Sequence, residues 1–384
     1  MNKLIKKNFY LLITTILLIS ILVISYKSTI LEILSVGGAA DFQWQPSKCV
    51  FEGINHYSSY LSRDGKCLIF MSQLGEYAQG LYILFYPFIF FEWHHAKVLW
   101  TIINIFLIFL THYILCKKFE VNKIYSLIII FFILSSTITK INLIMGQHTV
   151  VTLFFLTLTF IYKNKFSYVL SGISYFKYNI GYGLFIFYLV QKKYKELLLS
   201  IIPCFFGYLI YCFITETNFI TNILQPIQLM VYNAKSGTTL NRPYLFSFIL
   251  NIPIFVNYKY LLILFFTLIF NLVITSKIVK LTNDLQKLSC LCTLILISTP
   301  HWGHDNILLT PLLIFGIRYY QSNLLIMLTN IIVVIYFLNF YRTIQIYLDL
   351  DFNYDHLNIL ILLFILFINL KLKVKKKSDI FRSF

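Results

Sequence analysis

Residues 93–116 read WHHAKVLWTIINIFLIFLTHYILC, and beyond its polar first turn this stretch is almost wholly apolar. About 20 such residues are enough for one helix to cross a bilayer. Similar runs recur along the whole chain, in which hydrophobic residues make up 59% and charged residues only 12%. Soluble proteins carry about 25% charged residues. The composition therefore predicts an all-α, polytopic transmembrane helical bundle.

The remaining apolar runs predict the other membrane segments. They are Phe9–Ser25, Ile124–Ser136, Thr149–Tyr162, a pair of short helices within Tyr168–Val190 that breaks near Lys177–Gly183, Leu197–Ile214, Tyr260–Thr275, Cys290–Thr299, Ile307–Tyr320, Leu324–Phe340 and Leu357–Leu372. A short turn, Lys140–Gln147, is expected after the second of these runs. The pattern gives about 12 helices, and no internal repeat or linker divides the single domain of residues 1–384.

The positions of the lysines predict the orientation. They cluster in alternate connections, such as Lys192–Lys195, and positively charged loops stay in the cytoplasm. Both termini are then cytoplasmic, and the net charge of +17 requires no nucleic-acid partner. The external segments are residues 27–91 and residues 215–258, the second with an amphipathic stretch. A cleaved signal peptide is the alternative for Phe9–Ser25, but the run is long for one and no small-residue cleavage site follows closely.

The first external loop opens with VGGAADFQWQPSKCVFEGINHY, residues 36–57. It contains Asp41 and Glu52, two of only 15 acidic residues in the chain. Asp41 follows a run of glycines and alanines and precedes an aromatic patch. A carboxylate just outside a membrane helix, on a flexible approach, suits a general base at the membrane surface. A solvated loop carboxylate is the alternative on this stretch alone.

The seven cysteines say little about function. Cys49 and Cys67 share the first external loop, where oxidation can join them, but the sequence does not decide whether it does. The other five fall within or at the ends of apolar runs, where cysteine acts as a small hydrophobe. No CxxC motif or His/Cys cluster indicates a structural zinc site.

Two polar groups lie in otherwise apolar surroundings. Lys177 falls in the break of the predicted helix pair, and a lysine inside a membrane needs a partner or water. Snorkelling of its side chain to an interface is the alternative. Gly146-Gln147-His148 heads a helix on the predicted external side, where backbone N–H groups can face an anion. An ordinary helix cap is the alternative there.

A third polar site is the predicted external turn PHWGHD, residues 300–305. Its His301 and His304 are candidate donors to a phosphate, whereas HxxH without a third ligand is a weak metal signal. Arg242 and Arg342 are external and could contact phosphate, although isolated surface arginines are usually solvated. The DxD spacing of residues 349–351 occurs in soluble nucleotide-sugar transferases, but no extramembrane segment is long enough for their nucleotide-binding domain.

Taken in order, these features resemble the membrane glycosyltransferases of the GT-C fold. The resemblance is closest to glycosyltransferase family 87, the polyprenol-phosphate-mannose-dependent α-mannosyltransferase-like proteins. It covers most of the first 310 residues, and its specificity comes from the order of short motifs. The matching residues are Asp41, Gly53, Asn55, Tyr57, Pro87, Trp100, Gly146, Gln147, Lys177, Pro300, Trp302 and His304.

The chain departs from the family pattern at three places. His56 stands where the family often has proline, Tyr77-Ala78-Gln79-Gly80 replaces a Tyr-Pro-Pro motif, and no proline follows Lys177 closely. These departures concern the fine substrate specificity more than the class of enzyme.

The resemblance implies a site and a reaction. Asp41 would be the catalytic base, which deprotonates an acceptor hydroxyl for attack on a sugar carried by a polyprenyl phosphate, with inversion. Lys177, His301 and His304 would stabilise the leaving phosphate. No metal or other cofactor is required, because basic side chains can neutralise this leaving group. Further candidate site residues are Glu52, Tyr57, Gln147 and Arg242.

The expected partners are a polyprenyl-phosphate sugar donor, with mannose as the sugar, and an extracytoplasmic lipid or glycan acceptor at the plasma membrane. Two other classes remain open. An O-antigen-type polysaccharide polymerase or ligase would usually rely on external arginines, which are few. A non-catalytic lipid-linked transporter would need charged residues along a central path, or internal repeats, and the sequence displays neither.

Overall fold

Every regular element that the structure describes is a helix. The computed structural model describes residues 19, 26–35, 41–67, 75, 77–235, 245, 259–299, 303–319, 324–338 and 354–372. The predicted span Phe9–Ser25 lies outside these residues except for Ile19. The all-helical class predicted from composition is confirmed over the described ranges.

Several helices have the length and composition of membrane spans. In the described part of the chain, three qualify alone: α5 (Trp93–Lys118), α11 (Tyr194–Ile214) and residues Leu262–Val279 of α13 (Lys259–Val279). A bent pair, α6 (Lys123–Ser135) and α7 (Thr137–Met145), can form a fourth span with an angle of 53° at its break. Shorter apolar helices are α8 (Thr149–Tyr162), α10 (Tyr178–Val190), α16 (Leu324–Phe337) and Asn358–Lys371 within α18 (Tyr354–Lys371). The protein is a helical membrane protein, but a bundle of about twelve spans is not confirmed.

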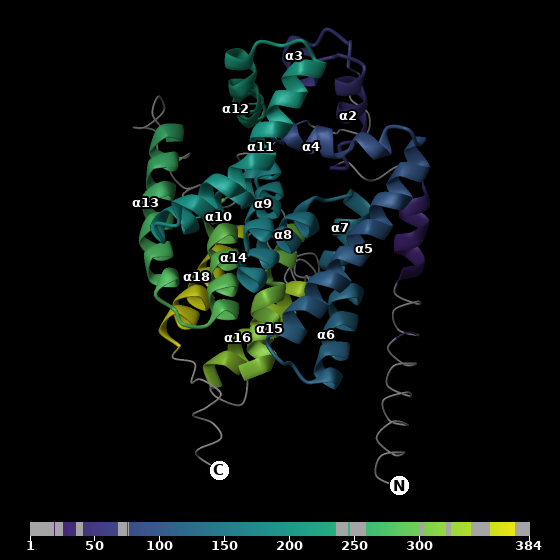
Figure 1. The fold of residues 1–384 in the computed structure, drawn as a ribbon. Helices are drawn as coiled ribbons and strands as arrows, with labels where there is room; N and C mark the ends of the chain where they lie inside the picture. The colour runs from purple at the N-terminus through teal and green to yellow at the C-terminus, as the bar shows by residue number, and fades with distance from the viewer. Residues whose placement is uncertain are drawn as a thin grey trace.

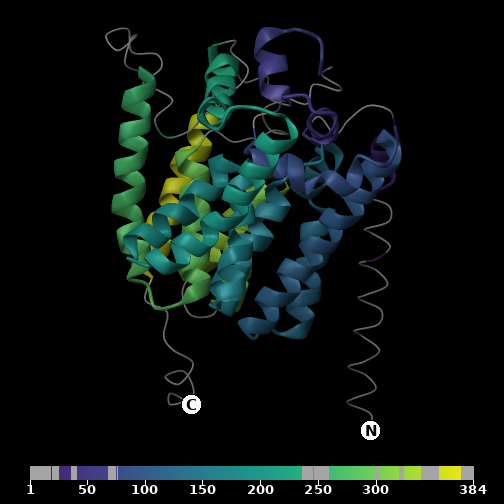
Figure 2. The same cartoon turned by 45° about the horizontal axis from the view of Figure 1, so that its top comes forward.

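The helices form a bundle with a smaller group of elements at one end. In Figure 1, α13 stands along one side and α5 and α6 along the other. The short helices α2 (Trp44–Phe51) and α3 (His56–Ser62) lie with α12 (Phe219–Lys235) at one end, and the turned view of Figure 2 keeps this arrangement. We call this end group, residues 44–67 and α12, the external lobe, following its predicted side of the membrane.

Helix α14 (Asp284–Ser298) is the central helix of the bundle. Every side chain from Leu288 to Ser298 is buried, which accords with its nearly uniform apolar sequence. It packs against α10, α13, α18 and α15 (Thr310–Tyr319), and the short helix η5 (Gly303–Leu309) connects the α14 side of the bundle to α15.

The predicted turn Lys140–Gln147 is wrong, because most of it belongs to α7. Two local signals explain the helix. The Ser136 side chain accepts a hydrogen bond from the Thr139 backbone N–H at 3.3 Å and so caps the first turn. Gly146 then ends the helix in the left-handed conformation, with φ +66°.

Residues 26–34, at the start of the predicted first external segment, are helical. Lys97 of α5 explains where this helix ends. Its side chain is 1% exposed, and Nζ donates to the carbonyl oxygens of Glu32 and Ser35, both at 3.2 Å. A cation at the C-terminal end of a helix satisfies carbonyl groups that the helix itself leaves without donors.

The external lobe is held by a disulfide and by side-chain amides. Cys49 and Cys67 are bonded, which answers the question that the sequence left open. Asn55 caps α3 by accepting from the Ser58 N–H and donates to Gln225 Oε1 of α12 at 2.8 Å. Helix α12 is amphipathic, as predicted for this segment. An apolar face is exposed, with apolar side chains at positions 219, 220, 223, 224 and 227, whereas Leu229 is buried.

The predicted helix break is confirmed and lies at Lys177. Helix α9 (Lys165–Ser171) continues into the 3₁₀ helix η2 (Gly172–Phe176), and α10 begins at Tyr178. Lys177 has φ −96° and ψ 78°, which is not helical. Helix α4 (Gln79–Leu84) crosses α11 closely enough that a Cβ on Gly207 would lie 2.4 Å from the Cα of Gly80. This crossing sets Tyr77 and Ala78 beside η2, where the Ala78 N–H donates to the Phe176 carbonyl at 3.1 Å.

Candidate active site

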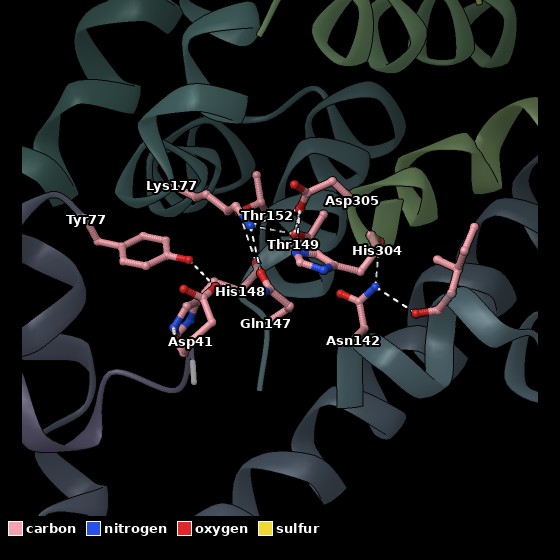
Figure 3. Close-up of polar contacts among 11 residues, drawn as sticks. Asp41, Tyr77, Asn142, Gln147, His148, Thr149, Thr152, Lys177, His304 and Asp305 are labelled. Carbon is pink, nitrogen blue, oxygen red and sulfur yellow. Dashed lines mark hydrogen bonds and ion pairs between the residues drawn. The ribbon is translucent and has the colours of Figure 1, made fainter. Parts of the chain in front are cut away.

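Asp41 lies at the junction of the lobe and the bundle. Its backbone N–H donates to the Met145 carbonyl at 3.0 Å, and its carbonyl oxygen lies 3.0 Å from His148 Nε2. The Tyr77 hydroxyl donates to Asp41 Oδ2 (Figure 3). The Asp41 side chain is half-buried. Main chain and side chain are therefore both fixed by contacts with other elements.

The α7–α8 turn needs a glycine where Asp41 docks on it. A Cβ on Gly146 would lie 2.6 Å from the Cβ of Phe42, and its positive φ disfavours other residues. The Gly146 carbonyl accepts from Trp100 Nε1 at 2.9 Å. Phe42 is fully buried and stacks on Trp100, with ring centroids 5.8 Å apart. Gly146 and Trp100 thus hold the residue that follows Asp41.

Tyr77 is fixed by two buried tyrosines. Its carbonyl accepts from the Tyr57 hydroxyl, and its N–H donates to the Tyr82 hydroxyl at 3.2 Å. Tyr57 is fully buried, so this predicted site residue acts in the structure through the backbone of Tyr77. Tyr77 itself was not predicted as a site residue, because its segment was seen only as a departure from a family motif.

The second part of the site surrounds Lys177. Its Nζ lies 3.0 Å from Gln147 Oε1, 2.8 Å from Thr149 Oγ1 and 3.0 Å from Asp305 Oδ1. Thr149 also donates to Asp305 Oδ1. The side chains of Lys177 and Asp305 are only 6% and 3% exposed. Lys177 is therefore a buried ammonium with a carboxylate partner and does not snorkel to an interface.

The structure places His304 next to this pair. Its Nε2 is 3.9 Å from Asp305 Oδ1, and its carbonyl accepts from Asn142 Nδ2 at 2.6 Å. The sequence analysis named no partner for Lys177. The structure supplies one, because Asp305, which follows His304 in the chain, contacts Lys177 directly.

Three consecutive residues of the α7–α8 turn connect the two parts of the site. His148 contacts the Asp41 carbonyl, while Gln147 and Thr149 contact Lys177 (Figure 3). The prediction that Gly146-Gln147-His148 heads a helix is confirmed, since α8 begins at Thr149. This turn therefore contacts both the main chain of Asp41, the predicted base, and the buried ammonium of Lys177.

Glu52 is the remaining predicted residue that the structure describes, and it is not part of this arrangement. Glu52 follows α2 at the surface of the lobe and is exposed. His301 and Arg242 lie outside the described residues. Among the residues that are described, no three His, Cys, Asp or Glu side chains group as metal ligands would.

The fold and the site together define a helical membrane protein with a carboxylate, a buried ammonium and a histidine at one polar junction. The chain belongs to glycosyltransferase family 87, whose family model matches residues 77–300, more than half of the 384 residues. The matched segment contains Tyr77, Gln147 and Lys177, while Asp41 precedes it and Asp305 follows it. No curated protein and no solved structure matches the chain significantly.

Proposed function

We propose that this glycosyltransferase moves a sugar, mannose, from a polyprenyl-phosphate donor to a lipid or glycan acceptor, with Asp41 as general base. The active site would face the extracytoplasmic side of the plasma membrane, with both chain termini in the cytoplasm. The observation that carries the proposal is the turn that joins Asp41 to the Lys177 cluster. A base and a cation in one site match the two charges that such a reaction must handle.

The proposed reaction is a single displacement at the anomeric carbon. Asp41 takes the proton of the acceptor hydroxyl, whose oxygen forms the new glycosidic bond. The bond between the anomeric carbon and the phosphate oxygen breaks, and its electron pair leaves with the polyprenyl phosphate. Attack from the side opposite the leaving group inverts the configuration. Lys177 and His304 would stabilise the phosphate charge that develops.

Two observations favour Asp41 as the base over the other acidic residues near the site. Asp305 is 3% exposed and paired with Lys177, and an ammonium 3.0 Å away makes a carboxylate a weaker base. Glu52 is exposed and lies on the lobe without a contact to the Lys177 cluster in the described structure. Asp41 is half-buried and its position is fixed by Tyr77 and His148.

The test replaces two acids of the first loop, Asp41 and Glu52, in parallel. Asp41→Asn keeps the shape and removes the base, so turnover of radiolabelled polyprenyl-phosphate-mannose with cell-envelope lipids should fall by roughly a hundredfold or more. Donor binding should survive, because the carboxylate is not proposed to contact the phosphate. Glu52→Gln is the matched control and should retain turnover.

Other outcomes have definite meanings. A collapse in Glu52→Gln with near-normal turnover in Asp41→Asn would transfer the role to Glu52. Near-normal turnover in both variants would remove this loop from the chemistry. A wild-type protein that forms no labelled product from any polyprenyl-phosphate sugar would reject the proposed donor.

A further inference from the structure

The Lys177 ammonium has no N–H left over for a phosphate. A lysine has three N–H donors, and Lys177 Nζ has three acceptors within 3.0 Å, on Gln147, Thr149 and Asp305. Two of these acceptors are neutral, and the third carries a full negative charge. A phosphate oxygen that approaches Lys177 must therefore displace a protein acceptor or bind beside one.

The positive charge of Lys177 is also cancelled locally. Asp305 Oδ1 lies 3.0 Å from Nζ, and both side chains are buried, so little solvent screens the carboxylate from a nearby anion. His304 approaches the same oxygen at 3.9 Å. The Lys177–Asp305 pair therefore presents a strong dipole with no net charge.

In the proposed reaction, the absence of net charge on the Lys177–Asp305 pair affects how tightly the product is held. The donor is a phosphodiester with one negative charge. The product is a polyprenyl phosphate monoester, which carries about −1.5 to −2 charges at pH 7 because its second pKa is near 6. A site with an unopposed lysine would hold the product more tightly than the donor, and release of the product would slow turnover.

We propose that Asp305 is a specificity-determining residue that prevents the site from retaining the doubly charged product. This inference rests on the proposed function, because it takes the lipid phosphate as the ligand. Asp305 repels each added phosphate charge while Lys177 attracts it. The singly charged donor meets this repulsion once. The doubly charged product meets it twice, so the attraction of Lys177 is offset for both of its charges.

The first test is Asp305→Asn. The amide keeps an oxygen acceptor for Lys177 and Thr149 but removes the charge. Affinities are measured for two probes, polyprenyl phosphate and its methyl diester, in one nanodisc preparation. We expect the affinity for the monoester to rise about tenfold or more relative to the diester, as the removal of one nearby charge allows. Polyprenyl phosphate should also become a stronger inhibitor of turnover.

The matched control is Asp284→Asn. Asp284 pairs with Lys163 at 2.6 Å, partly exposed, so the variant removes the same charge from a second Lys–Asp pair. The ratio of the two affinities should remain at its wild-type value. A ratio in Asp305→Asn that stays unchanged, or that moves toward the diester, overturns the inference.

A second measurement needs no variant and covers the case in which Asp305→Asn does not fold. Between pH 5 and pH 8 the monoester gains its second charge, whereas the diester does not. Because the Lys177–Asp305 pair has no net charge, wild-type affinity for the monoester should not rise relative to the diester over this range. The diester corrects for titration of the protein groups around the site, namely Lys177, Asp305, His304, His148 and Asp41. A relative rise in monoester affinity would contradict the role of Asp305.

The outcomes separate this inference from the proposed function. Suppose that the wild-type protein binds both probes, but that the ratio of monoester to diester affinity does not respond as expected to Asp305→Asn or to pH. The donor class then stands, and Asp305 does not have the proposed role. A wild-type protein that binds neither probe rejects the lipid phosphate as ligand, and the inference with it.

Discussion

At the scale of single residues, Tyr77 connects the proposed base, Asp41, to buried tyrosines of neighbouring elements. The Tyr77 hydroxyl donates to Asp41 Oδ2, and the backbone of Tyr77 is held by Tyr57 and Tyr82. These two supporting tyrosines are fully buried. Tyr77 therefore acts on the reaction through Asp41, as a positioning residue.

We expect Tyr77→Phe to shift the acidic limb of the pH profile of kcat/KM to higher pH. A hydrogen bond donated to a carboxylate favours its ionised form. Such bonds to charged groups contribute about 1.5 kcal/mol or more, so the shift should be about one pH unit. Tyr86→Phe, which removes the hydroxyl of an exposed tyrosine, is the control. A fall in kcat with the limb unmoved would indicate that Tyr77 contributes only packing.

The sequence identified some site residues and missed others for physical reasons. Lys177 and Gln147 were recognisable because polar groups in apolar surroundings are costly unless they are paired. The partner of Lys177 was not, because Asp305 is 128 positions away in the sequence. No local periodicity relates η5 to the helix break, so only the packed structure reveals the pair.

At the scale of elements, the lobe is organised around a buried histidine. His56 opens α3 and is 3% exposed. Its Nδ1 lies 3.0 Å from the Tyr211 hydroxyl of α11, and its ring packs against Tyr57 and Tyr82. Burial lowers the pKa of His56 to about 3, although a hydrogen bond with the Gly75 backbone opposes the shift. The lobe is therefore built around a neutral imidazole.

We expect the lobe to lose stability as the pH falls below about 6.5, the usual pKa of histidine in an unfolded chain. The unfolded lobe then binds a proton that the folded lobe excludes until the pH approaches 3, so stability decreases with decreasing pH. At pH 4 the loss is about 3 kcal/mol. Hydrogen exchange of α3 amides between pH 7 and pH 4, corrected for intrinsic exchange, measures it.

His56→Gln is the comparison for this experiment. It removes the titrating group, so the dependence of α3 protection on pH should flatten even if the lobe is less stable throughout. An equal slope in wild type and variant would assign the effect to another group, such as Asp64. Hydrogen bonds from the Ser59 hydroxyl and the Lys66 backbone lower the pKa of Asp64.

Long and short elements differed in how well the sequence predicted them. The bounds of α5, α8 and α11 were close to the predictions, because uniform apolar runs dominate them. Helix α7 was predicted as a turn, since its ends depend on one serine cap and one glycine and the apolar pattern does not mark them. Short helices set by caps are therefore the elements most easily missed.

At the scale of the whole molecule, α11 links the bundle to the lobe. Its first residue is Tyr194 and its last is Ile214, and α12 follows after a short connection. Asn55 and Ser58 of the lobe contact Gln225 of α12, at 2.8 Å and 2.7 Å. The side of the membrane on which α12 lies is therefore also the side of the lobe that supports Asp41.

Two exposed positions that flank α11 test the orientation. Lys195 lies in its first turn and Thr221 in the first turn of α12. We expect a membrane-impermeant maleimide to label Thr221→Cys in intact cells, and Lys195→Cys only after permeabilisation, because lysines near Lys195 favour the cytoplasm. Cys49 and Cys67 are bonded, and the other cysteines are buried or partly buried, so the unmodified chain supplies a low background.

Labelling of the Thr221→Cys and Lys195→Cys variants distinguishes three arrangements of α11 in the membrane. Label on Lys195→Cys but not on Thr221→Cys in intact cells would reverse the orientation and place the proposed acceptor in the cytoplasm. Equal access at both positions would mean that α11 does not cross the membrane, despite 21 residues of suitable composition. The expected pattern puts the lobe outside the cytoplasm. An acceptor hydroxyl must then reach Asp41 from the external surface, since Tyr77, which contacts Asp41, is itself held by Tyr57 of α3.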